Sequence, residues 1–129
     1  MGDHESGRRL VLMAQKDFQA MTGMGNVEVF SDEVFGFHAQ QAVEKSLKAW
    51  LVLNGKEYPL THSLRVLMAE LTRTGEDMEP LMDLVELNAY AVQYRYDSIE
   101  PDEVPLDRTE MVKKVGALVN KVLEKLDRL

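Results

Sequence analysis

A stripe of polar side chains on an otherwise apolar helix is the part of this sequence that could do chemistry. Residues 37–50 read FHAQQAVEKSLKAW. At 100° per residue, five polar side chains fall within an arc of about 120°: His38, Gln41, Glu44, Lys45 and Lys48. Apolar residues cover most of the remaining circumference, whereas the apolar stripe of a surface helix is usually the narrower one. We therefore expect a central helix, packed on most sides, whose polar stripe serves ion pairing, a partner or a ligand.

Two histidines lie outside the N-terminal tail, His38 and His62. A pair of imidazoles can bind a metal or exchange protons. A metal would need a third ligand, however, and no HxxxH, HxxE or ExxH spacing is present. We expect hydrogen-bonded structural roles, with His62 capping free amides at a helix start, and neither a metal nor a cofactor.

The elements that must position these groups are all helical. Five segments show apolar residues at helical spacing, and none shows the sustained alternation of apolar and polar residues that is typical of strands. The sequence therefore predicts an all-α protein. The expected helices cover about residues 5–22, 32–54, 61–73, 79–96 and 107 to near the C-terminus. Ser31 or Asp32 caps the second and Thr61 or His62 opens the third, while Asp107 and Glu110 have capping-box spacing before the fifth. Gly55 and Gly75 end the second and third helices.

The fourth predicted helix combines an apolar face with a cation. Its expected buried face holds Leu81, Leu84, Val85, Ala91 and Val92, and Asn88 and Arg95 share that face. A guanidinium there needs a carboxylate, and Glu44 and Asp97 are the candidates. Alternatively, Arg95 lies in a cleft and binds a phosphate. The neighbouring Tyr90, Tyr94 and Tyr96 either stack on a base or pack against another helix.

Composition limits the class of protein. A chain of 129 residues, 45% apolar and 29% charged, fits one globular domain spanning residues 1–129 and not a disordered chain. It has no cysteine, which excludes disulfides and thiolate metal sites. No apolar run is long enough to span a membrane or resembles a secretory signal, so we expect a cytoplasmic protein. Its eight methionines are expected to fill the core.

The net charge of −7 comes from one region. Residues 76–106 contain nine acids against Arg95 alone, and such a field opposes tight, non-specific binding of nucleic acid. The last 23 residues are mildly basic, and we interpret their cations as one solvated helix face: Arg108, Lys113, Lys114, Lys121, Lys125 and Arg128.

Three motifs occur together in a fixed order: HAQQAVEKSLKAW, THSL after the Gly55 turn, and YAVQYRY. With these motifs, roughly residues 5–128 resemble the HEPN family of small prokaryotic helical proteins. The resemblance implies an up-and-down four-helix-type bundle of about five helices. It also implies a homodimer, which is often partnered with a minimal nucleotidyltransferase. An apolar surface on residues 32–54 too large for one small bundle to cover favours the dimer as well.

The resemblance also suggests an activity, because many HEPN members are metal-independent endoribonucleases in which an Arg is followed, after four to six intervening residues, by a His. Here no His follows Arg95, so the motif is incomplete. Our leading hypothesis is a non-catalytic module, associated with a minimal nucleotidyltransferase in a toxin–antitoxin-like pair, that binds a nucleotide or RNA weakly. Its cleft candidates are His38, Gln41, Glu44, Lys45, Lys48, His62, Tyr94, Arg95, Tyr96 and Asp97. The alternatives are a ribonuclease toxin whose acid and base are other residues, and a purely structural interaction protein.

Overall fold

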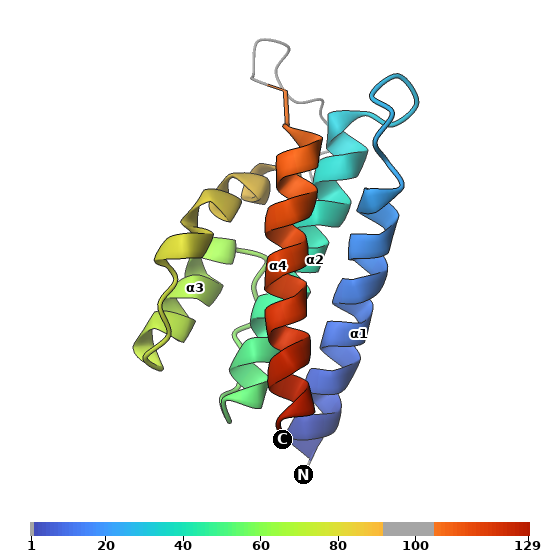
Figure 1. Ribbon diagram of the computed structural model, residues 1–129. Coiled ribbons are helices and arrows are strands. Elements are labelled where there is room, and N and C mark those ends of the chain that lie inside the picture. Colours follow the sequence, from blue (N-terminus) through green and yellow to red (C-terminus); the bar gives the residue numbers. More distant parts are fainter. Residues whose placement is uncertain (1, 92–104) are drawn as a thin grey trace.

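The computed structural model describes residues 2–91 and 105–129, and these residues form five helices and no strand. The helices are α1 (Gly2–Thr22), α2 (Asp32–Leu53), α3 (Leu64–Arg73), the 3-10 helix η1 (Glu79–Tyr90) and α4 (Arg108–Asp127). Figure 1 shows α1, α2 and α4 as long neighbouring helices, with α3 and η1 along one side. The chain runs up in α1, down in α2, up in η1 and down in α4. The predicted all-α, up-and-down bundle is confirmed.

Helix α2 is the centre of the bundle. It contacts each of the other four helices, and none of residues 32–54 is exposed. Its buried aromatic and aliphatic side chains include Phe35, Leu47 and Trp50. The prediction of a central helix is therefore confirmed. The argument that α2 has surplus apolar surface for a dimer was wrong, because the other helices of the same chain cover that surface.

The helix ends follow local hydrogen-bonding rules. Val34 N donates to Ser31 Oγ at the start of α2, and Glu110 N donates to Asp107 Oδ1 at the start of α4. Helices α2 and α3 are followed by Gly55 and Gly75, whose φ angles of 79° and 97° favour glycine. These predicted signals are confirmed.

The predicted start of α3 was wrong by two or three residues. Ser63, and neither Thr61 nor His62, is the N-cap, and its hydroxyl accepts a hydrogen bond from Val66 N. Leu64 N donates to the side chain of Asn88 on η1 over 2.8 Å. His62 thus precedes the helix, and its side chain is free to bond elsewhere.

The fourth helix differs from the predicted α-helix. Residues 79–90 form a 3-10 helix, and Leu84, Leu87 and Tyr90 are buried at intervals of three residues. The expected face was based on 3.6 residues per turn, and only Leu84 of its described members is fully buried. With three residues per turn, every third side chain returns to the same face, which brings in Leu87 and Tyr90. Val92 lies outside the described residues.

Tyr90 packs against α2 at a glycine. A Cβ atom added to Gly36 would lie 2.5 Å from carbons of the Tyr90 ring, so only a glycine allows this close approach. The tyrosine is almost completely buried. For Tyr90, the packing alternative is correct and base stacking is excluded in this conformation.

Candidate functional site

Glu44, on the central helix, is the hub of a polar cluster that spans α2 and the segment before α3. Only 5% of its side chain is exposed. Its Oε1 accepts a hydrogen bond from Gln40 Nε2 (2.9 Å), and its Oε2 accepts one from Lys48 Nζ (2.9 Å). His62 Nδ1 lies 3.1 Å from each carboxylate oxygen. A buried carboxylate is thus compensated by two donors from its own helix and an imidazole from outside it.

Gln40 and Lys48 hold the carboxylate in place. The amide of Gln40 is fully buried, and it also donates to the main-chain oxygen of His62 over 3.3 Å. Lys48 is 12% exposed, and its ammonium lies 5.2 Å from the centre of the Tyr58 ring. The i to i+4 pair that we predicted between Glu44 and Lys48 is confirmed. Because the pair is largely buried, removal of one partner would leave an uncompensated charge and would destabilise the fold more than removal of one partner of a surface pair.

His62 is the solvent-facing member of this cluster, with 68% of its side chain exposed. A carboxylate only accepts hydrogen bonds, so the nitrogen that faces Glu44 carries the proton. Its other ring nitrogen, Nε2, then lies on the far side of the ring from Glu44. The histidine is hydrogen-bonded as predicted, but the capping role was wrong, because Ser63 caps α3.

The electrostatics of the cluster favour an ionised Glu44. Burial raises the pKa of this carboxyl. The hydrogen bonds from Gln40 and Lys48, the charge of Lys48 and the hydrogen bond from His62 outweigh burial, so the net pKa lies below the ordinary value of 4.5. At neutral pH His62 therefore faces a negative charge, which fixes the orientation of its ring.

A second polar cluster joins α1 to α2 and contains two other residues of the predicted stripe, His38 and Lys45. On α1, the Oδ1 atom of Asp17 lies 3.1 Å from His38 Nδ1. The Oδ2 atom of Asp17 accepts a hydrogen bond from Lys45 Nζ over 2.6 Å. The five predicted stripe residues are thus divided: Glu44 and Lys48 join His62, whereas His38 and Lys45 hold α1 against α2. Gln41 belongs to the first group, because its amide donates to Gln40 Oε1 over 2.7 Å.

Four predicted cleft residues lie outside the described residues: Tyr94, Arg95, Tyr96 and Asp97. The chain enters that segment after Ala91, three residues beyond Asn88. The side chain of Asn88 accepts a hydrogen bond from Leu64 N, so the last turn of η1 lies beside the residues that follow His62. Glu44, which we considered as a partner for Arg95, already has Gln40, Lys48 and His62 around its carboxylate.

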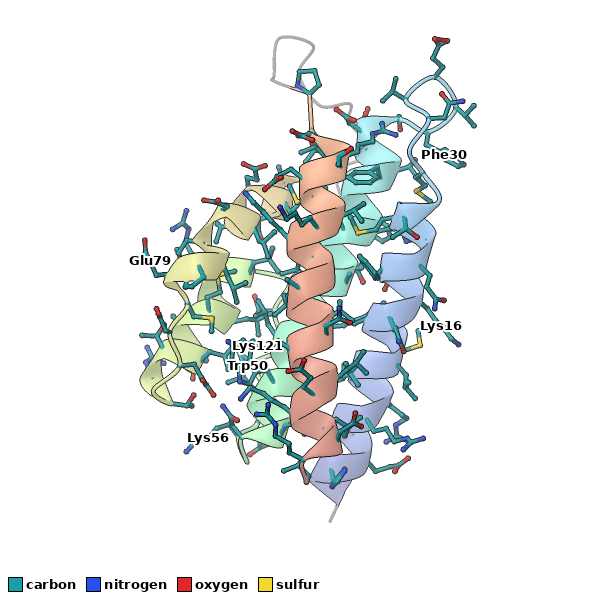
Figure 2. The ribbon with its side chains drawn as sticks, in the orientation of Figure 1. Lys16, Phe30, Trp50, Lys56, Glu79 and Lys121 are labelled. Atoms are coloured by element: carbon teal, nitrogen blue, oxygen red, sulfur yellow. The ribbon has the colours of Figure 1, made fainter. Side chains whose placement is uncertain are left out.

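Sequence reasoning missed several polar residues that make hydrogen bonds between distant parts of the chain. Gln40 and Asp17 had no signal beyond a polar residue at a helical position. Glu76 accepts hydrogen bonds from the Trp50 indole and from Asn54, and its pKa is lowered because these bonds and nearby lysines outweigh the effect of burial, which raises it. In Figure 2, Lys121 points toward Trp50, and its ammonium lies 5.1 Å from the ring centre.

The interpretation of the basic C-terminal residues as one solvated helix face was wrong for Arg108, which is buried. Its side chain is 8% exposed. It donates to the main-chain oxygens of Met24 and Phe30 and to Asp32 Oδ1. Its guanidinium also lies 5.0 Å from the centre of the Phe35 ring. Arg108 is therefore a structural residue that joins α4 to the segment between α1 and α2.

In the part of the chain that the structure describes, no three His, Cys, Asp or Glu residues are grouped so that they could hold a metal ion. Within the same residues, no helix is both long and apolar enough to cross a membrane.

Comparison with known proteins gives one result. The family model of the HEPN domain matches residues 8–129, nearly the whole chain. Neither the curated proteins nor the solved structures give a match. The matched range includes Glu44, Lys48 and His62, and the predicted resemblance to this family is confirmed. The chain therefore belongs to the HEPN domain family.

Proposed function

We propose that this chain is a non-catalytic module that binds a nucleotide or single-stranded RNA at the surface around His62. The observation that carries the proposal is an exposed imidazole whose Nδ1 is held by a buried carboxylate. The HEPN match supports a nucleotide- or RNA-related role at the level of the family. A minimal nucleotidyltransferase is the protein partner that we propose, on the basis of the same resemblance.

The chemistry of the cluster suits a ligand with both phosphates and bases. In the protonated imidazole, Nε2 is a charged donor to a phosphate oxygen. In the neutral imidazole the same nitrogen accepts a hydrogen bond from a base or a ribose hydroxyl. We propose that Arg95 supplies a second contact to phosphate, since its planar guanidinium suits bidentate binding.

Two features favour non-catalytic binding over cleavage: the hydrogen bonding of Lys48 and the absence of a His after Arg95. Hydrolysis of RNA needs a base, a proton donor and a cation that stabilises the phosphate. The Lys48 side chain is 12% exposed and its ammonium donates a hydrogen bond to Glu44 Oε2, so it is not available to a phosphate. Arg95 would supply the cation, but no His follows it in the sequence to act as the proton donor.

Binding is tested by the fluorescence anisotropy of a labelled single-stranded oligoribonucleotide and of a labelled ATP analogue. Loss of a charge-assisted hydrogen bond in His62→Ala should weaken binding by about tenfold or more. The matched control is His38→Ala, which removes an imidazole held by Asp17 and should leave affinity unchanged. Binding should also weaken as salt rises. Equal affinities of wild type and His62→Ala, or no binding by wild type, would contradict the proposal.

A ribonuclease is the second candidate, and the His62–Glu44 pair is the observation that favours it. A carboxylate that orients an imidazole is the arrangement of a general base. The histidine that is absent after Arg95 would then be supplied by His62. Single-stranded RNA and transfer RNA incubated with and without EDTA distinguish the candidates. We expect no cleavage above background, and specific cleavage that is lost in both His62→Ala and Arg95→Ala would establish the ribonuclease instead.

We also propose a homodimer, which forms through a surface other than that of α2. Leu60 is almost completely exposed and Val66 partly so, and these apolar side chains flank His62 in the sequence. Light scattering should give about twice the chain mass of 14.7 kDa, and Leu60→Ser/Val66→Ser should shift the protein toward monomer because it removes apolar contact area. A monomeric wild type at tens of micromolar would refute the dimer.

A further inference from the structure

The outer face of α1 carries an apolar groove that the bundle does not use. Leu12 and Met13 are 41% and 46% exposed, although most other large apolar side chains among the described residues are buried or partly buried. Together with Arg9, Gln15, Lys16 and Gln19 they line a groove of about 470 Å³. Figure 2 shows Lys16 extending from α1 away from the rest of the bundle.

This groove is not needed to hold α1 in place. The opposite face of α1 supplies Val11, Ala14 and Met21, which are fully buried, and α1 packs on α2 and α4 through that side. Met13 is thus an exception to the expectation that the methionines fill the core. Its unbranched thioether side chain is well suited to adaptable contacts with a partner.

The rim of the groove is positively charged. Arg9 and Lys16 line the groove, and Arg8 precedes Arg9 on the same helix. All three are exposed, and among the described residues their side chains form no ion pair or hydrogen bond. Glu5 is the acid on the same helical face, so the face has a positive balance on a chain whose net charge is −7. Uncompensated cations around an apolar centre fit an acidic partner.

The placement of the charges argues against a second copy of this chain. In an antiparallel two-fold contact centred on Leu12 and Met13, Arg9 of one copy would face Lys16 of the other. Like charges that meet across an interface oppose association. A nucleic acid fits poorly because the groove is mainly apolar. A membrane surface fits poorly because two partly exposed side chains offer little apolar area to insert.

We propose that the outer face of α1 is a docking surface for an acidic amphipathic helix of another protein. Arg9 and Lys16 are seven residues apart, which is about 10.5 Å along a helix, with Leu12 and Met13 between them. A partner helix matches this spacing with acids at positions i and i+7 and large apolar side chains at i+3 and i+4. The pattern Glu-x-x-Leu-Leu-x-x-Glu has that form, and it matches in either helix direction.

The test uses two capped helical peptides of otherwise identical sequence, one with the Glu-x-x-Leu-Leu-x-x-Glu pattern and one with Lys in place of both Glu residues. By fluorescence anisotropy, the acidic peptide should bind the full chain at least about tenfold more tightly than the basic one. The double variant Arg9→Glu/Lys16→Glu should reverse this preference. Leu12→Ser/Met13→Ser should lose binding of the acidic peptide.

Lys113→Glu is the matched control, since it changes the charge of an exposed lysine on α4 and should keep the preference of the wild type. Circular dichroism melts confirm that each variant is folded. Equal binding of both peptides, or no binding of the acidic peptide at about 1 mM, would overturn the proposal. Dimer mass that is lost in Leu12→Ser/Met13→Ser would assign the face to a second copy. Binding of anionic vesicles or RNA that requires Leu12 and Met13 would assign it to those ligands instead.

Discussion

Replacing Glu44 with alanine is expected to lower the free energy of unfolding by about 3–5 kcal/mol, because the change breaks a buried ion pair and leaves the remaining charge uncompensated. Lys48 is 12% exposed and would keep its ammonium without the carboxylate. The fully buried Gln40 amide would lose its 2.9 Å acceptor as well. Urea denaturation at neutral pH measures the loss. The matched control is Glu70→Ala, which breaks an ion pair with Arg73 on the surface and should change stability by no more than about 0.5 kcal/mol.

The same carboxylate should contribute to the acid sensitivity of the fold. Its pKa is lowered in the folded chain, because the hydrogen bonds from Gln40, Lys48 and His62 and the charge of Lys48 outweigh burial. A carboxyl with a lowered folded pKa stabilises the fold above its ordinary pKa of 4.5, and this contribution is lost as the pH falls through the folded value. As the pH falls below about 4.5, the free energy of unfolding of the wild type should therefore decrease more steeply than that of Glu44→Gln. Parallel pH profiles, or a loss below about 1 kcal/mol in Glu44→Ala, would mean that the cluster contributes little to stability.

Replacing Arg108 with alanine should also lower the free energy of unfolding by about 3–5 kcal/mol, because it leaves the Asp32 carboxylate without its cation and two main-chain oxygens without their donor. The guanidinium donates over 2.7 Å to Met24 O, 2.6 Å to Phe30 O and 2.9 Å to Asp32 Oδ1. Arg108→Lys should recover only part of the loss, since an ammonium cannot reproduce the planar fork. Thermal and urea unfolding measure both variants, and hydrogen exchange should show faster opening of residues 23–31.

Arg128→Ala provides the comparison on the same helix. Its side chain is exposed and lies 3.9 Å from Glu124, so its removal should change stability by less than about 0.5 kcal/mol. If Arg108→Ala behaves like Arg128→Ala, then Arg108 does not hold α4 to the segment between α1 and α2. In that case the interpretation of a solvated basic face would be restored.

The sequence by itself determined the helical class and most helix ends. Ser31, Asp107, Gly55 and Gly75 act on the main chain within a few residues, so their effect can be read locally. The narrow polar stripe of residues 37–50 likewise predicted the central position of α2, because a helix that is apolar on most sides must be covered on most sides. The 3-10 form of η1 was not predicted, since its buried face depends on packing against Gly36 and α2.

Only the tertiary structure decided which polar groups meet. Glu44 and His62 are 18 residues apart, Asp17 and Lys45 are 28 apart, and Arg108 donates to Met24 across 84 residues. Periodicity places each side chain on a face of its own helix, but it leaves the rotation and offset of one helix against another undetermined. Those are set by the packing of the whole core, such as the Tyr90 ring against Gly36. The same packing divided one predicted stripe into two groups. His38 and Lys45 contact Asp17 on α1, whereas Glu44 and Lys48 meet the exposed His62 from the segment before α3. Each carboxylate binds the donors that the fold brings within hydrogen-bonding distance.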